Sequence, residues 1–155
     1  MRRLTTHVPE SRNEFVMVGG ALYLGTALAA FVPPATVAAF VAQVPLPPAA
    51  LAVAVVLAVL GLAHIGVPQI VAASVLGGAF GNASALGVSP LVLGSGLLGA
   101  WAVSASTTPV GAASLTVARL AGVPVGVVCR DWNGMFTLAA AVLLAAWMFG
   151  LAAIL

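Results

Sequence analysis

Long apolar runs, separated by prolines, glycines and short polar breaks, make up nearly all of this sequence. The first run, residues 15–32, is close to the roughly 20 residues that a helix needs to cross the hydrocarbon core of a membrane. Two prolines follow it. Residues 33–48 hold a shorter apolar stretch with prolines on both sides. We therefore predict a membrane span over 15–32 and a connecting arm over 33–48 that lies near the membrane interface.

Two short apolar runs then flank a break at His64–Gln69. The first of them, residues 49–63, is marginal for a full crossing, and the second, residues 70–80, is too short. Two short helices around a glycine- and proline-containing turn predict a re-entrant hairpin over 49–80. The backbone at the tip of such a hairpin must be buried in protein or line a water-filled cavity. The alternative is a kinked helix pair that crosses the membrane completely.

The next apolar stretch, residues 90–120, is too long for one straight span and contains the polar run Ser104–Pro109. Pro109 lacks a backbone N–H and clashes with the preceding helical turn. Thr108 precedes a proline and is therefore steered away from helical dihedral angles. The sequence predicts a helix broken in mid-membrane, with one half ending near Val103 and the other beginning near Val110. A last apolar run predicts a final span over 134–155.

Composition places this pattern in a lipid bilayer. Of the 155 residues 63% are hydrophobic and 5% are charged, with a mean hydropathy of +1.22. Soluble domains carry about 25% charged residues. Between Phe15 and Ala118 no residue bears a formal charge. We therefore predict an all-α membrane protein with about three full transmembrane spans plus the hairpin. Its polar tail covers residues 1–14, and its single membrane domain covers 15–155.

The basic residues predict the orientation of the chain. All five arginines lie either in the N-terminal tail or between residues 119 and 131. If the hairpin re-enters, these two segments share one side, which the positive-inside rule makes cytoplasmic. We expect an integral protein of the cell's inner (plasma) membrane with a cytoplasmic N-terminus. A cleaved signal peptide is the alternative, but the polar residues 5–14 separate the basic start from the apolar run, which favours an uncleaved helix.

Several functional classes are disfavoured by the sequence. A net charge of +2 and 6% aromatic residues give little basis for nucleic-acid binding. Cys129 is the single cysteine, so it cannot form an intrachain disulfide. The spans hold no carboxylate, and no cluster of cysteine and histidine has the spacing of metal ligands. We therefore expect no enzyme, no metal site and no cofactor. The expected partners are the lipid bilayer and a small anionic substrate.

The two polar breaks are the candidate binding site. Helix ends leave N–H and C=O groups without partners, and these attract anions and cations respectively. Paired interruptions of hydrophobic segments indicate the substrate and ion sites of transporters. The candidate substrate- or ion-binding residues are His64, Gly66, Ser104, Ser106, Thr107, Thr108, Pro109 and Gly111.

Each kind of candidate has a plainer alternative. Small hydroxylated residues also pack membrane helices and satisfy the backbone around a proline. A histidine within membrane segments can bind substrate or move protons, or it can remain neutral and cap helix carbonyls. The residues alone leave both questions open.

The order of these elements resembles the C-terminal repeat of the ion transporter superfamily, which includes divalent anion/sodium symporters, citrate-type permeases and arsenite-pump membrane subunits. The resemblance covers the chain from about Phe15 onward, and Thr107, Thr108 and Pro109 match the Thr-Pro motif of that family's broken helix. It implies a site for a carboxylate and a coupling sodium ion, formed by the hairpin tip and the helix break. The tip here reads His64-Ile65-Gly66-Val67-Pro68 in place of Ser-Asn-Thr, which leaves both Na⁺ and H⁺ open as the coupling ion.

The chain is long enough for one such repeat, whereas full transporters of this family contain two inverted repeats. Inverted repeats meet at the substrate site, so one repeat supplies half of it. The chain is then a C-terminal fragment, one product of a split gene, or a half that assembles with a second half-transporter chain or as a homo-oligomer. A functional alternative of another class is a non-transporting membrane scaffold or assembly protein.

Overall fold

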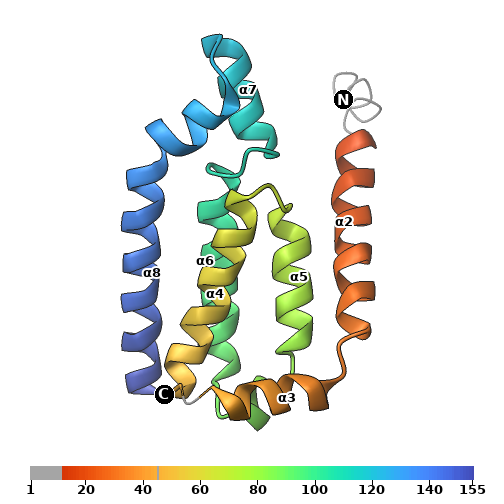
Figure 1. Ribbon diagram of the computed structural model, residues 1–155, viewed down its shortest axis with the longest axis vertical. Coiled ribbons are helices and arrows are strands. Elements are labelled where there is room, and N and C mark those ends of the chain that lie inside the picture. Colours follow the sequence, from red (N-terminus) through yellow and green to blue (C-terminus); the bar gives the residue numbers. More distant parts are fainter. Residues whose placement is uncertain (1–11, 45) are drawn as a thin grey trace, which may run out of the picture.

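The computed structural model describes residues 12–44 and 46–155, and every regular element in these ranges is helical. Five helices stand side by side (Figure 1). They are α2 (Arg12–Ala30), α4 (Pro48–His64), α5 (Gln69–Ala79), α6 (Pro90–Ala105) and α8 (Gly134–Ile154). Four shorter elements connect them: α3 (Pro34–Gln43), η1 (Ala83–Leu86), α7 (Ala112–Ala121) and η2 (Val127–Trp132). The predicted all-α fold class is confirmed.

Proline sets the beginnings of three helices. Pro34, Pro48 and Pro90 occupy the first turns of α3, α4 and α6. A proline is tolerated there because the first N–H groups of a helix have no partner within the helix, and its fixed φ suits the helix. The helix α3 lies across the lower end of the bundle, in the segment predicted as a connecting arm (Figure 1).

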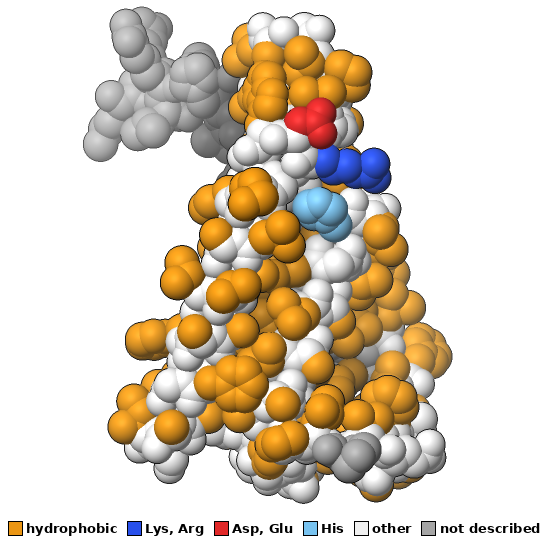
Figure 2. Space-filling view, turned by 60° about the vertical axis from the view of Figure 1, so that its left-hand side comes forward, with side chains coloured by type: hydrophobic (Ala, Val, Ile, Leu, Met, Phe, Trp, Pro, Cys, Tyr) orange, Lys and Arg blue, Asp and Glu red, His pale blue; other side chains and the backbone are white. Residues whose placement is uncertain are grey.

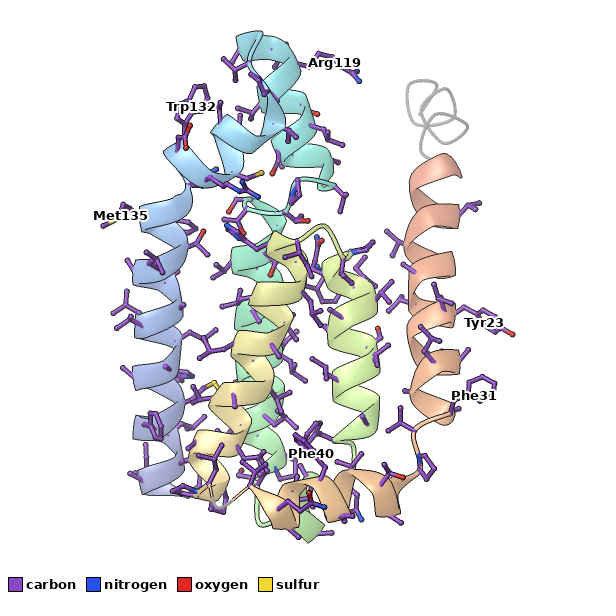
Figure 3. All side chains as sticks on the ribbon, viewed as in Figure 1. Tyr23, Phe31, Phe40, Arg119, Trp132 and Met135 are labelled. Atoms are coloured by element: carbon purple, nitrogen blue, oxygen red, sulfur yellow. The ribbon has the colours of Figure 1, made fainter. Side chains whose placement is uncertain are left out.

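The core forms around α4. This helix packs against α5, α6 and α8, whereas α2 packs against α5 at the edge of the bundle. Val59 of α4, Ala100 of α6 and Met148 of α8 are fully buried. Small residues such as Ala100 and Gly96 let α6 approach α4 and α8 closely at this core. The outer faces of α2 and α8 carry large exposed hydrophobic side chains. Tyr23 and Met135, for example, are 77% and 78% exposed and point away from the bundle (Figure 3).

The number of spans is smaller than the sequence predicts. By length and composition, α8 alone among the described helices is long and apolar enough to cross a membrane, with 21 residues and a hydropathy of 2.2. Residues 18–30 and 35–43 pass the same test only when they are taken together, and they are bent by 75° relative to each other. With 16 residues, α6 is about 24 Å long, short of a hydrocarbon core of about 30 Å. Three full spans are therefore not supported by these helices.

Two boundaries also differ from the sequence prediction. The broken helix is interrupted between Ala105 and Ala112, later than predicted, because Ser104 remains helical and its hydroxyl donates to the carbonyl of Ala100. The connection predicted over 119–133 contains a helical segment, η2, which is a π-helix with Val128 and Cys129 buried. Val128 and Cys129 pack inward, although the polar residues of this connection predict a solvent-exposed loop.

Candidate functional site

The tip of the α4–α5 hairpin meets the break between α6 and α7. Gly66 lies in the turn after α4 with a φ of +99°. A Cβ atom placed on Gly66 would lie 3.9 Å from side-chain atoms of both Pro109 and Val110, which is ordinary van der Waals contact. The two polar breaks, separated by about 40 residues of sequence, are thus neighbours in the fold. Of the predicted site residues, Gly66 and Pro109 are brought together directly.

Backbone hydrogen bonds fix the shape of the break. The N–H groups of Thr107 and Thr108 both donate to the carbonyl of Ser104, at 3.1 and 3.0 Å. The N–H of Gly111 donates to the carbonyl of Thr108 at 3.1 Å. These bonds form two consecutive tight turns around Pro109. The N–H of Gly111, one of the candidate binding residues, is therefore already used within the turn and is not free to bind a substrate.

The hydroxyl groups at the break differ sharply in their partners. The hydroxyls of Ser104, Ser106 and Thr107 donate to helix carbonyls three or four residues earlier, at 2.6, 3.1 and 3.3 Å. Their protons are thus engaged, and only their oxygen lone pairs remain for a ligand. Thr108 is fully buried, and its Oγ1 has no hydrogen-bond partner in the described part of the chain. A buried polar atom without a partner is rare in folded proteins.

Two further residues converge on the break, and the sequence pattern did not indicate them. The Ser114 hydroxyl and the Asn133 side-chain amide both donate to the carbonyl of Ser106, at 3.2 and 3.1 Å. Ser114 belongs to α7, and Asn133 precedes the first residue of α8. The three elements are therefore tied together at one carbonyl oxygen. Asparagine directly before a helix is a common N-cap, which was the available signal, but here its side chain bonds a distant turn instead.

These bonds also place the break along α8. Asn133 lies at the beginning of α8, so the break is level with the start of that helix and not with its middle. The hairpin tip lies at the same height along α8, because His64 and Gly61 line one groove with Gly134 and Met135 at the start of α8. The expected mid-membrane position is therefore not found relative to α8. The reason is length, since α4 and α6 run beside most of α8 before they end.

His64 faces a different direction from the threonines. It is the last residue of α4, and its side chain lines the groove between α4 and α8 together with Arg130. Figure 2 shows an acidic, a basic and a histidine side chain close together in the upper third of an otherwise hydrophobic face. His64 and the threonines of the break thus lie at the same end of the helices. His64 lines a groove, however, whereas Thr107 and Thr108 are buried.

The helix ends at the hairpin tip and at the α6–α7 break carry partial charges of both signs. The helices α5 and α7 begin there, and α4 and α6 end there (Figure 1). Helix starts favour anions, and helix ends favour cations. Within residues 12–44 and 46–155, no group of three or more His, Cys, Asp or Glu side chains could hold a metal ion.

Comparison with known proteins gives no relative. No family model matches the sequence, and neither the curated proteins nor the solved structures gave a significant match. The resemblance to the ion transporter superfamily stays a prediction from the sequence motifs.

The Gly66 backbone offers a direct test of how rigid the hairpin tip is. We expect Gly66→Ala to destabilise the folded protein by about 1–3 kcal/mol, because φ = +99° is strained for any residue with a Cβ atom. Space is not the cause, since the added atom meets its neighbours at 3.9 Å. The measurement is thermal unfolding of the detergent-purified protein. In Gly61→Ala, within helix α4, the added atom meets nothing within 4 Å, so this control should be neutral or slightly stabilising. Equal effects of the two substitutions would contradict a strained tip.

Proposed function

We propose that this protein is a membrane-embedded half-transporter that binds a small anion, a carboxylate, between the α4–α5 hairpin tip and the α6–α7 break. The observation that carries the proposal is the buried Thr108 hydroxyl without a partner, at the point where the two breaks meet. Because Thr108 is fully buried in this conformation, its hydroxyl would donate to a carboxylate oxygen once the hairpin tip and the break move apart. The starts of α5 and α7 would add favourable partial charge for an anion.

A bilayer location has independent support. The chain carries 5% charged residues, and α8 is long and apolar enough to cross a membrane. Many of the large side chains on the outside are hydrophobic, including Phe31 at 84% exposure and Leu120 at 83%. Such a surface is unfavourable in water and typical of contact with lipid. In this arrangement the N-terminal end of α2 and the α7–η2 connection share one end of the bundle, and the C-terminus lies at the other (Figure 1).

The proposed topology follows from these ends. In it, α8 spans the inner membrane, the hairpin and the α6–α7 pair penetrate without crossing as straight helices, and the end that holds Arg119 and Arg130 is cytoplasmic. The binding site would then lie near the cytoplasmic boundary. Because one repeat supplies half of a site, a second half-transporter chain or a second copy would complete it. Alternating access, with Na⁺ or H⁺ as the coupling ion, would expose the site to the other side.

A scaffold function is the second candidate, and one specific observation favours it. The hydroxyls of Ser104, Ser106 and Thr107 are bonded back to their own helix, as expected for residues that only stabilise a broken helix. The scaffold predicts that the protein binds no small anion and that polar residues at both breaks can be replaced by Ala without loss of function.

A thermal-shift screen separates these functions. The purified chain would be heated with mono-, di- and tricarboxylates and inorganic oxyanions, each in sodium and in potassium buffer. A ligand that binds only the folded state stabilises it by about 2.7 kcal/mol at 100 times its dissociation constant. We expect a selective shift with one class of carboxylate, and a difference between the two buffers would identify sodium coupling. A panel without any shift, repeated with a co-expressed partner half, would contradict the transporter and favour the scaffold.

A further inference from the structure

A groove between α4 and α8 lies next to the break but is not part of it. It encloses about 580 Å³ and is open toward the outside of the bundle. Its walls are apolar along their length, with Leu57 and Leu60 from α4 and Leu138 and Ala141 from α8. At one end the lining changes to His64 and Arg130. The groove is thus apolar along most of its length and has basic side chains at one end.

This pattern matches an amphipathic anion. We infer that the groove binds one anionic phospholipid, with an acyl chain between α4 and α8 and the headgroup phosphate at Arg130. Water could not fill an apolar groove of this kind favourably, whereas an acyl chain buries its surface and that of the leucines. The guanidinium of Arg130 offers a planar fork of donors that suits a phosphate. The inference rests on the bilayer location proposed above, but not on anion transport.

The titratable side chains that line the headgroup end are both basic. Arg130 lies on η2 and is exposed, and His64 lies opposite on α4. Asp131, which follows Arg130 in sequence, does not line the groove, but an acidic side chain lies directly beside the basic one on this face (Figure 2). The lining of the groove end is therefore basic, with one carboxylate just outside it that lowers its positive potential. Its place at the arginine-rich end of the bundle agrees with the cytoplasmic leaflet, where anionic lipids attract basic residues.

Photo-crosslinking tests the inference on the full chain in phosphatidylcholine nanodiscs. The discs would contain, at equal mole fraction, either phosphatidylglycerol or phosphatidylcholine with a photoactivatable group in one acyl chain, and mass spectrometry would map the labelled residues. We expect labelling concentrated on the α4 and α8 residues of the groove, with phosphatidylglycerol about fivefold ahead of phosphatidylcholine. Labels spread evenly over the exposed faces of α2 and α8, without lipid preference, would overturn the inference.

Two pairs of variants locate the chain and the headgroup. Gly61→Leu should fill the groove and remove labelling by both lipids, since Gly61 lines the groove and an added Cβ there meets nothing within 4 Å. Gly150→Leu, an equally open position outside the groove lining, should leave it unchanged. Arg130→Gln should lower phosphatidylglycerol labelling to the phosphatidylcholine level, and Arg119→Gln, outside the groove, should not. If the groove residues are still labelled in Gly61→Leu, the inference that an acyl chain occupies the groove is wrong.

A competition arm distinguishes a lipid from a free phosphate compound. Glycerol 1-phosphate carries the same anionic group without acyl chains. We expect it to leave the labelling unchanged at millimolar concentration, because the apolar groove supplies most of the contact. Complete competition would show that only a headgroup is bound and would overturn the lipid inference. Thr108→Val should leave groove labelling intact, so a failed lipid test beside a Thr108-dependent carboxylate shift removes this inference alone.

Discussion

Thr108→Val is expected to raise the stability of the ligand-free protein and to abolish its stabilisation by the carboxylate. The two effects have opposite directions and one cause. In the ligand-free fold the Thr108 hydroxyl is buried without a partner, which costs about 1–3 kcal/mol of desolvation, and valine has nearly the same shape without the hydroxyl. With ligand bound, the same hydroxyl would donate a hydrogen bond that valine cannot replace. The measurement is thermal unfolding with and without saturating ligand.

The controls for Thr108→Val separate binding from packing. Thr108→Ser keeps the hydroxyl and should retain the ligand-induced shift. Thr26→Val removes a hydroxyl that donates to the carbonyls of Leu22 and Tyr23 on an exposed helix face, so it should leave the shift unchanged. A full ligand-induced shift in Thr108→Val would sink the binding role of this residue. If Thr108→Val is more stable than the parent protein and no ligand stabilises the parent, the scaffold function is favoured instead.

The outline of the helices could be predicted from the sequence because the signals are local. Prolines mark the beginnings of α3, α4 and α6, and the break after α6 contains Pro109. Length is harder to predict. Residues 15–32 look like a span by composition, but the helix begins at Arg12, in charged sequence, and ends at Ala30. The helix η2 was missed because π-helical hydrogen bonding leaves no simple periodicity in six residues.

The candidate site could be located from the sequence but not resolved. Four of the five residues from 104 to 108 carry a hydroxyl, and the sequence does not show which of these hydroxyls bond to carbonyls of the preceding helical turn. The hydroxyls of Ser104, Ser106 and Thr107 donate to helix carbonyls, whereas the Thr108 hydroxyl makes no such bond. The contact of Asn133 with Ser106 spans 27 residues, so no local pattern encodes it. The sequence places His64 at the same end of the helices as the hydroxylated residues, because position along a helix can be predicted from the chain. The direction in which the His64 side chain points cannot.

Gly96→Leu is expected to have the largest effect on folding of any single substitution considered. Gly96 is where α6 meets both α4 and α8. A Cβ atom placed there would lie 2.6 Å from the Met148 side chain and 2.8 Å from Cγ2 of Val56, well inside contact distance. Met148 is flexible enough to move, but Val56 is β-branched and fully buried, so the helices must separate. Overpacking of a core by a few atoms costs about 1–3 kcal/mol or more, and leucine adds four heavy atoms where the first does not fit.

Gly94→Leu provides a matched control on the same helix, because an added Cβ at Gly94 meets nothing within 4 Å. It should fold as well as the parent, and a better helix former in place of glycine should raise its stability slightly. Size-exclusion chromatography and thermal unfolding in detergent would report both variants. If Gly96→Leu unfolds near the parent temperature, then α4, α6 and α8 do not pack as closely as described. Met148→Ala in the Gly96→Leu background should restore part of the loss, since it vacates space that the leucine enters. This rescue would identify the contact of α4, α6 and α8 at Gly96 as the source of the loss.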